Sequence, residues 1–283
     1  MTSLVLTVLS CFAVAANGDG SVRSESVLVP GGKLMLRAEL WRPAGPGPFP
    51  GVVFNHGSAR ASATPAGRQD RRNRLKEPGI LGPIFARHGY VFLYFYRRGE
   101  GLSPGRGSSS GDRMASALAS RGQEGRNQIQ LQLLETDEMG DAMSGLAFLR
   151  ALTEVDPQRV AAVGHSFGGS LTLLMAERDP MLRTVVVFSG AGGSWSGSPP
   201  LQARLRNAVG SIRVPVFFIH AANDYSTAPG RELGDEMARL HKPYRVKIYP
   251  PVGATADDGH RFVVLGTPTW ESEVFAFLDE YTK

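Results

Sequence analysis

The chain has 283 residues, of which 42% are hydrophobic and 20% charged, and this is enough to bury one substantial core without disulfides or metals. Its formal net charge is +5. The basic residues do not form stripes with interleaved aromatic residues, however, so the composition argues against a nucleic-acid-binding protein.

Residues 1–16 form an apolar run that contains no acidic residue and ends in small residues, a pattern typical of a secretory signal peptide. The run is too short to span a bilayer comfortably, so we expect a secreted or periplasmic protein without stable membrane insertion. No lysine or arginine precedes the run, which departs from the usual signal. Cys11 lies within the run, either as an ordinary apolar position or in a sequence that loosely resembles a lipoprotein cleavage box. Cleavage would leave no cysteine, and therefore no disulfide.

A linker over residues 17–26 is expected to precede a single domain over residues 27–283, where short apolar runs alternate with longer segments of helical period. This alternation predicts an α/β domain with a parallel sheet. The expected strands are 34–41, 52–55, 90–96, 160–164, 184–189, 214–220 and 245–249, and the expected helices are 131–152, 168–178, 229–240 and 269–281. Two long connections, 58–79 and 97–127, contain no expected element, and connections of that length are usually functional or mobile.

Residues 164–168 read Gly-His-Ser-Phe-Gly, between an apolar strand and a helical run. This motif works as a sharp turn in which small residues at both ends let the strand and helix approach closely. The helix start also directs backbone N–H groups toward developing negative charge. We therefore predict Ser166 as a nucleophile and a structural role for His165. The alternative is a glycine-rich turn in a non-catalytic α/β protein.

A serine hydroxyl needs a base within hydrogen-bond reach, and that base is held by a third group. In this arrangement the acid and then the histidine follow the serine along the chain. Asp224 comes just after the expected strand 214–220, and His260 lies in a loop before the last helix. We predict Asp224 as the acid and His260 as the base. The alternatives are that Asp224 is only a turn residue and that His260 is only a solvated loop histidine. Asp257 or Asp258 could also orient His260 in place of Asp224.

Attack on a carbonyl creates an oxyanion that fixed donors must stabilise. The backbone N–H of Phe167, after the nucleophile, should supply one donor. The backbone N–H of Ser58 should supply the other, because it lies in a glycine turn after the expected strand 52–55. We expect His56 to pack and bond under that turn. No paired metal-ligand spacing is present, so no metal or other cofactor is expected.

Several further matches accompany the serine motif over residues 27–282: Asn-His-Gly-Ser at 55–58, Arg-Gly-Glu-Gly-Leu-Ser at 98–103, Ala-Asn-Asp at 222–224 and Asp-Gly-His at 258–260. With them the chain resembles α/β-hydrolases, and within these the dienelactone-hydrolase-like and prolyl-oligopeptidase-like serine hydrolases. The resemblance implies a doubly wound, mostly parallel eight-stranded sheet and hydrolysis of an ester, lactone or amide through an acyl-enzyme. True dienelactone hydrolases use a cysteine where this chain has Ser166, and the oligopeptidases usually carry a propeller domain first.

We therefore expect a hydrolase of carboxylic esters with a small or medium acyl group. An exopeptidase or amidase using the same residues, or a catalytically silent binding protein, is the alternative. A cluster of basic residues follows Ser58, facing only Asp70 and Glu77: Arg60, Arg68, Arg71, Arg72, Arg74 and Lys76. Positive charge at a cleft attracts anions, so the ester could be anionic. A solvated charge run is the plainer interpretation.

Overall fold

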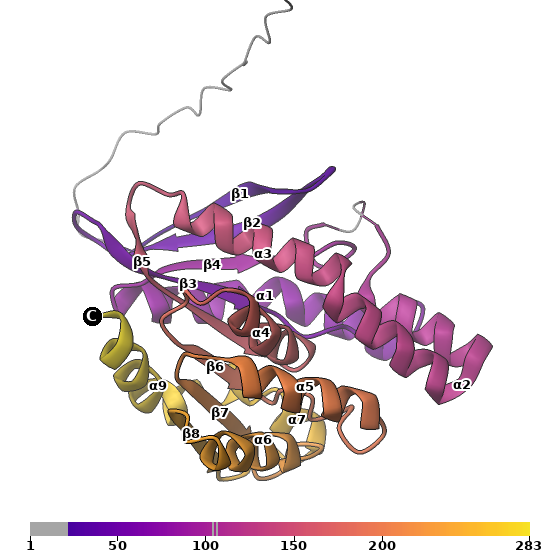
Figure 1. Ribbon diagram of the computed structural model, residues 1–283. Helices are drawn as coiled ribbons and strands as arrows, with labels where there is room; N and C mark the ends of the chain where they lie inside the picture. Colours follow the sequence, from indigo (N-terminus) through magenta and orange to yellow (C-terminus); the bar gives the residue numbers. More distant parts are fainter. Residues whose placement is uncertain (1–21, 104, 106) are drawn as a thin grey trace, which may run out of the picture.

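The computed structural model describes residues 22–103, 105 and 107–283, so the expected signal peptide and Cys11 lie outside the described residues. An open eight-stranded sheet forms the centre of the molecule, in the order β1-β2-β4-β3-β5-β6-β7-β8 (Figure 1). β2 pairs antiparallel with β1 and β4, and the pairs from β4 to β8 are parallel. The predicted doubly wound, mostly parallel α/β fold is confirmed.

The strands are β1 Arg23–Gly31, β2 Leu34–Arg42, β3 Phe49–Asn55, β4 Val91–Phe95, β5 Val155–His165, β6 Val185–Phe188, β7 Val216–Ala221 and β8 Tyr244–Tyr249. Every strand predicted from an apolar run is present. β1 was not predicted, because it is an edge strand whose side chains are mostly exposed, so no buried run marks it. Residues 23–26, which the sequence places in a linker, belong to this strand and pair with β2.

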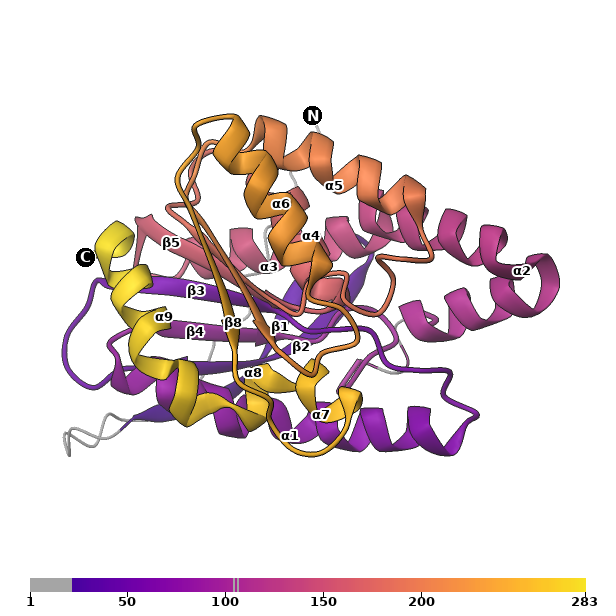
Figure 2. The ribbon, with the colours of Figure 1, turned by 90° about the horizontal axis from the view of Figure 1, so that it is seen from below.

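The helices are α1 Pro65–Arg87, α2 Ser110–Glu135, α3 Asp137–Arg150, α4 Phe167–Arg178, α5 Pro199–Ser211, α6 Ala228–Arg239, α7 Ala256–His260, α8 Phe262–Leu265 and α9 Thr267–Thr282. Helices cover both faces of the sheet (Figure 2), and an apolar cluster lies between each layer of helices and the sheet. One joins the sheet to α2, α3, α4, α5 and α6, and the other joins it to α1, α8 and α9. Successive side chains of a strand point to opposite faces of the sheet, and Val52 and Val53 of β3 accordingly belong to different clusters.

The long connections are where the structure differs most from the sequence prediction. Most of the segment 58–79 belongs to α1, which begins after the N-cap Thr64 and contains Pro78 and Pro83. Prolines normally end a helix, so this one was missed. The segment 97–127 contains most of α2, which turns at Gly122 with a φ of 66° and extends beyond the sheet in Figure 1. The helix expected over 131–152 is divided at Thr136.

No helix among residues 22–103, 105 and 107–283 is both long and apolar enough to cross a membrane.

Candidate active site

Ser166 occupies the turn between β5 and α4, with φ 57° and ψ −120°. A positive φ is unfavourable for a residue with a Cβ atom, so the surrounding packing must hold this turn. The two glycines of the motif make that packing possible. A Cβ on Gly164 would lie 2.3 Å from the Gly168 carbonyl oxygen, and one on Gly168 would lie 2.0 Å from the Asn55 carbonyl oxygen. The strand and helix therefore approach as the sequence predicted.

The predicted base and acid lie beside Ser166 although they are distant in sequence. The Oγ of Ser166 lies 2.8 Å from Nε2 of His260, and Nδ1 of His260 lies 2.7 Å from Oδ1 of Asp224. Since a carboxylate only accepts hydrogen bonds, Nδ1 carries the proton and Nε2 is free to accept one from the serine hydroxyl. The structure thus brings the three predicted side chains into one hydrogen-bonded chain.

The alternative acids contact other groups. Asp258 accepts hydrogen bonds from the backbone and side chain of Thr255 and so caps the N-terminus of α7. Asp257 contacts the Tyr225 hydroxyl and forms an ion pair with Arg60. Of these carboxylates, only Asp224 contacts the His260 ring within the described residues.

Asp224 follows β7, and its carboxylate accepts three hydrogen bonds. Besides His260, the donors are Nδ1 of His220 at 2.8 Å and the backbone N–H of Tyr225 at 2.7 Å. Burial alone would raise the pKa of this carboxyl, but the hydrogen bonds from the two histidines outweigh burial and hold the pKa well below its ordinary value. Asp224 is therefore ionised at neutral pH. The contact with His220 was not predicted from the sequence.

His165 packs against the base without taking part in the hydrogen-bonded chain. Its Nε2 donates to the backbone carbonyl of His260 over 2.8 Å. Burial, and then the nearby His260, lower the pKa of His165 to about 3. The ring is therefore neutral at physiological pH and helps to fix the backbone of His260, which agrees with the structural role predicted for it.

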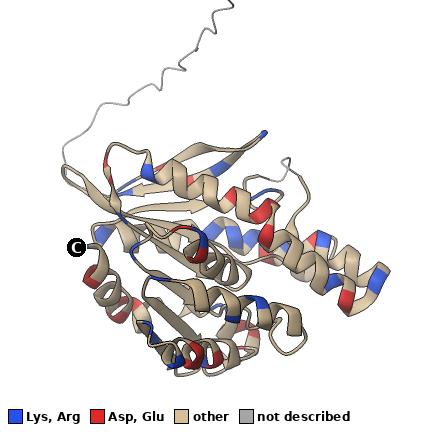
Figure 3. Cartoon of the chain, in the orientation of Figure 1, with Lys and Arg blue, Asp and Glu red and all other residues tan. Residues whose placement is uncertain are grey.

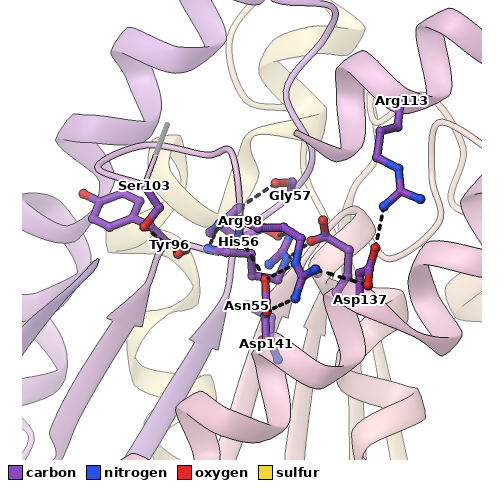
Figure 4. A network of polar contacts seen from close by, with 12 residues as sticks. Asn55, His56, Gly57, Tyr96, Arg98, Ser103, Arg113, Asp137 and Asp141 are labelled. Atoms are coloured by element: carbon purple, nitrogen blue, oxygen red, sulfur yellow. Dashed lines mark hydrogen bonds and ion pairs between the residues drawn. The ribbon is translucent and has the colours of Figure 1, made fainter. Parts of the chain in front are cut away.

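The turn after β3 is held by a buried polar network (Figure 4). Nδ1 of His56 donates to the Gly57 carbonyl over 2.7 Å, and Nε2 of His56 accepts from the backbone N–H of Arg97 over 3.2 Å. The Arg97 side chain also donates to the His56 carbonyl and pairs with Glu138 at 2.5 Å. His56 thus packs and bonds under the turn, as predicted. Arg97 was missed, although it directly precedes the Arg-Gly-Glu-Gly-Leu-Ser match.

A sequence model described as the dienelactone hydrolase family matches residues 82–264. This chain belongs to the dienelactone hydrolase family. It is therefore a hydrolase with an α/β-hydrolase fold. None of the curated proteins compared with it matches.

Solved structures show the same fold for this dienelactone hydrolase family member. An acylaminoacyl peptidase from Pyrococcus horikoshii matches with 15% identity and a TM-score of 0.62, over 92% of this chain and 41% of that chain. The chain thus spans about two fifths of the length of that peptidase. An esterase from Pyrococcus furiosus matches with 16% identity and a TM-score of 0.60, over 95% and 97% of the two chains. A dienelactone hydrolase from Anabaena variabilis matches with 18% identity and a TM-score of 0.56, over 93% and 99%.

In this hydrolase, Ser166 and His260 line a cavity of about 240 Å³. Ser58 and Phe167, the residues predicted to stabilise an oxyanion, line the same cavity. Both segments expected to be long connections contribute to its walls as helices: α1 supplies Asp70, Asn73, Arg74 and Glu77, and α2 supplies Met114 and Arg126. Gln130, just beyond the second segment, also lines the cavity. The cavity is therefore lined by charged side chains as well as by the hydrogen-bonded chain.

Most of the basic residues after Ser58 have partners within the protein (Figure 3 shows the charged residues along α1). Arg60 pairs with Asp70 and Asp257, Arg71 with Asp112, and the buried Arg74 with Glu77. Arg68 and Arg72 bond to the Ala63 carbonyl and to Gln69. Most of these arginines therefore have partners within the protein, and the segment 58–79, expected to be a connection without an element, is largely helical.

Arg126 differs from these arginines. Its Nη1 donates to Oε1 of Gln130 over 3.3 Å, and Nε2 of Gln130 donates to Ser194 over 3.2 Å. Within the described part of the chain no carboxylate lies within 4.0 Å of the Arg126 guanidinium, which is half-buried. Burial, with no acidic group to oppose it, lowers the pKa of Arg126. The cavity thus contains a cation without a protein counter-charge. No pattern in the sequence around Arg126 distinguishes it from other surface arginines.

Proposed function

We propose that this protein is a serine esterase that hydrolyses carboxylic esters with a small or medium acyl group, through an acyl-enzyme on Ser166. The observation that carries the proposal is the continuous hydrogen-bonded chain from Asp224 through His260 to Ser166, located at the start of α4 and beside a cavity. This is the relation between nucleophile, base and orienting acid that serine hydrolysis requires. No step of the reaction calls on a metal or an organic cofactor.

In the first half-reaction the Ser166 Oγ bonds to the ester carbonyl carbon while its proton moves to Nε2 of His260. The negative charge on the former carbonyl oxygen is stabilised by the backbone N–H groups of Phe167 and Ser58. The carbon–alkoxide bond then breaks, and the leaving alcohol takes the proton from His260. In the second half-reaction water attacks the acyl carbon, His260 takes a proton from that water, and Ser166 recovers its proton as the carboxylic acid departs.

We also propose that the preferred ester carries a carboxylate or a similar anionic group in its acyl or alcohol part. Arg126 supports this, because its guanidinium borders the cavity and lacks an acidic partner among the described residues. A substrate anion would supply that missing charge, and a charge-assisted hydrogen bond to arginine is among the stronger polar contacts. The proposal thus rests on direct contact within the cavity, and not on attraction by α1.

A substrate panel with a covalent probe tests the reaction class. The purified protein should hydrolyse nitrophenyl esters faster than aminoacyl anilides and should be labelled by a fluorophosphonate. Ser166→Ala should lower kcat for ester hydrolysis by ~10⁴-fold or more and should abolish labelling, while leaving the unfolding transition unchanged. Faster turnover of the anilides would make the protein a peptidase or amidase with the same residues. Absence of labelling and of turnover would make it a binding protein.

A further inference from the structure

The acid of the hydrogen-bonded chain is shared between two histidines. His260 contacts Oδ1 of Asp224 at 2.7 Å, and His220 contacts Oδ2 at 2.8 Å. The side chains of His220 and Asp224 are 1% and 0% exposed, so water does not compete for this second contact. Each carboxylate oxygen therefore has its own imidazole donor.

The position of His220 is fixed by the fold. It lies in β7, next to Ile248 of β8, and is therefore anchored by the sheet. On its other side α6 packs so closely that a Cβ on Gly230 would lie 2.8 Å from the His220 ring. Because the Asp224 carboxylate is ionised, Nδ1 of His220 must carry the proton and donate it. The ring is thus confined between the backbone of α6 and the carboxylate, in one tautomer.

We propose that His220 is a positioning residue: by donating to Oδ2 of Asp224, it sets the plane of the carboxylate so that Oδ1 points at Nδ1 of His260. This inference rests on the proposed esterase function. The backbone N–H of Tyr225 also donates to Oδ1, so without His220 both remaining donors hold the same oxygen and Oδ2 has none. A carboxylate bonded at one oxygen can turn about its Cβ–Cγ bond more easily than one bonded at both. The donor also draws part of the negative charge away from His260, and so limits how strongly the imidazolium is stabilised.

Two substitutions of similar size separate this role from simple packing. His220→Asn removes most of the ring but keeps an N–H donor close to the position of Nδ1. His220→Leu removes the ring and the donor together. A residue that only fills space would be equally damaged by the two changes, because they leave similar cavities. A positioning residue would be rescued by asparagine.

The expected result is a loss of kcat by ~10- to 100-fold for His220→Leu, as for a lost hydrogen bond to a charged group, and by less than about 5-fold for His220→Asn. The acidic limb of the kcat/KM profile should move in His220→Leu and stay in place in His220→Asn, because only the first variant changes how the carboxylate acts on His260. The other titratable rings near His260, those of His165 at 5.1 Å and Tyr225 at 4.7 Å, are unchanged in both variants. The position of the limb does not depend on how much protein is folded.

Equal loss of activity in the two variants, with no difference between their pH profiles, would overturn the inference. His220→Met is the second donor-free variant should His220→Leu not fold. In an Asp224→Asn background His220→Leu should lower kcat by less than about 3-fold, because its partner is already altered.

Wild-type protein and Ser166→Ala are measured beside these variants. If the wild type is active and Ser166→Ala is not, equal losses overturn only the role of His220. If Ser166→Ala retains activity, the esterase mechanism itself is wrong.

Discussion

Nδ1 of His260 lies 2.7 Å from Oδ1 of Asp224, although Asp257 and Asp258 lie only two or three residues before His260 in the chain. The turn of α7 directs Asp258 toward its own N-terminus, where it caps the helix. Proximity in sequence therefore works against Asp258 as the orienting acid, because a short helix presents neighbouring side chains in different directions.

Asp224→Asn should lower kcat by about 10⁴-fold, because an amide holds the wrong tautomer of His260. Asp258→Asn keeps a cap of similar quality and should lower kcat by less than about 5-fold. Steady-state ester hydrolysis by the two variants, at equal concentrations of folded protein, compares the two carboxylates. A larger loss in Asp258→Asn than in Asp224→Asn would reject Asp224 as the acid.

The elbow glycines provide a stability prediction with an internal control. Gly168→Ala places a Cβ 2.0 Å from the Asn55 carbonyl oxygen, so the strand and helix must separate. We expect a loss of at least about 1–3 kcal/mol in the free energy of unfolding. Gly140→Ala, in α3, meets nothing within 4 Å and should stabilise by roughly 0.5–1 kcal/mol through helix propensity. Urea denaturation measures both changes, and a destabilised Gly140→Ala with an unaffected Gly168→Ala would contradict the packing described here.

His165 should make the protein less stable in acid. Burial, followed by the proximity of His260, lowers the pKa of His165 from 6.5 to about 3 in the folded protein. Between these values the unfolded chain binds a proton that the folded protein does not, so the free energy of unfolding decreases as the pH falls through this range. His165→Gln can keep the donor to the His260 carbonyl and does not titrate. Its free energy of unfolding should therefore decrease less steeply with falling pH than that of the wild type.

Urea denaturation at several pH values between about 4 and 7 measures the two slopes. Other titrating groups contribute equally to both proteins, so the comparison isolates His165. Identical slopes would show that the ring is not held neutral by burial.

The features predicted correctly from the sequence are those encoded locally. Fully apolar runs such as 90–96 predict buried strands because a polar residue there would lie in the core. The serine motif predicts its own turn, since the two glycines are required by contacts of the turn itself. Chain order then places Asp224 and His260 after later strands, at the same edge of the sheet.

The features that were missed depend on tertiary contacts. α1 forms despite Pro78 and Pro83 because its buried side packs on the sheet through residues such as Leu81 and Phe85. The contact of His220 with Asp224 depends on how α6 closes over β7, and a histidine at the end of an apolar strand gives no sign of it. Arg126 lies in the largely polar helix α2. The sequence does not show which side chains surround it, so its lack of an acidic partner can be recognised only from the structure.

Arg126→Gln should reduce the proposed preference for anionic esters. It removes from the cavity a cation that has no ion-pair partner among the described residues, while keeping a polar side chain. We expect kcat/KM for an ester that carries a carboxylate to fall by ~10- to 100-fold, the range for a lost charge-assisted contact. For a neutral ester of similar size the change should stay within about 3-fold. Arg121→Gln, at an exposed position of α2, is the matched control and should change neither value.

Added salt distinguishes direct contact from long-range attraction. Exposed charges are screened over about 8 Å at physiological ionic strength, whereas a partly buried pair is screened much less. If Arg126 binds the substrate carboxylate directly, most of the preference should therefore persist when the ionic strength is raised. A preference that disappears with salt, or one that Arg126→Gln and Arg121→Gln reduce equally, would assign the effect to the overall positive charge of the protein. Equal kcat/KM for the charged and neutral esters in the wild type would remove the case for an anionic substrate.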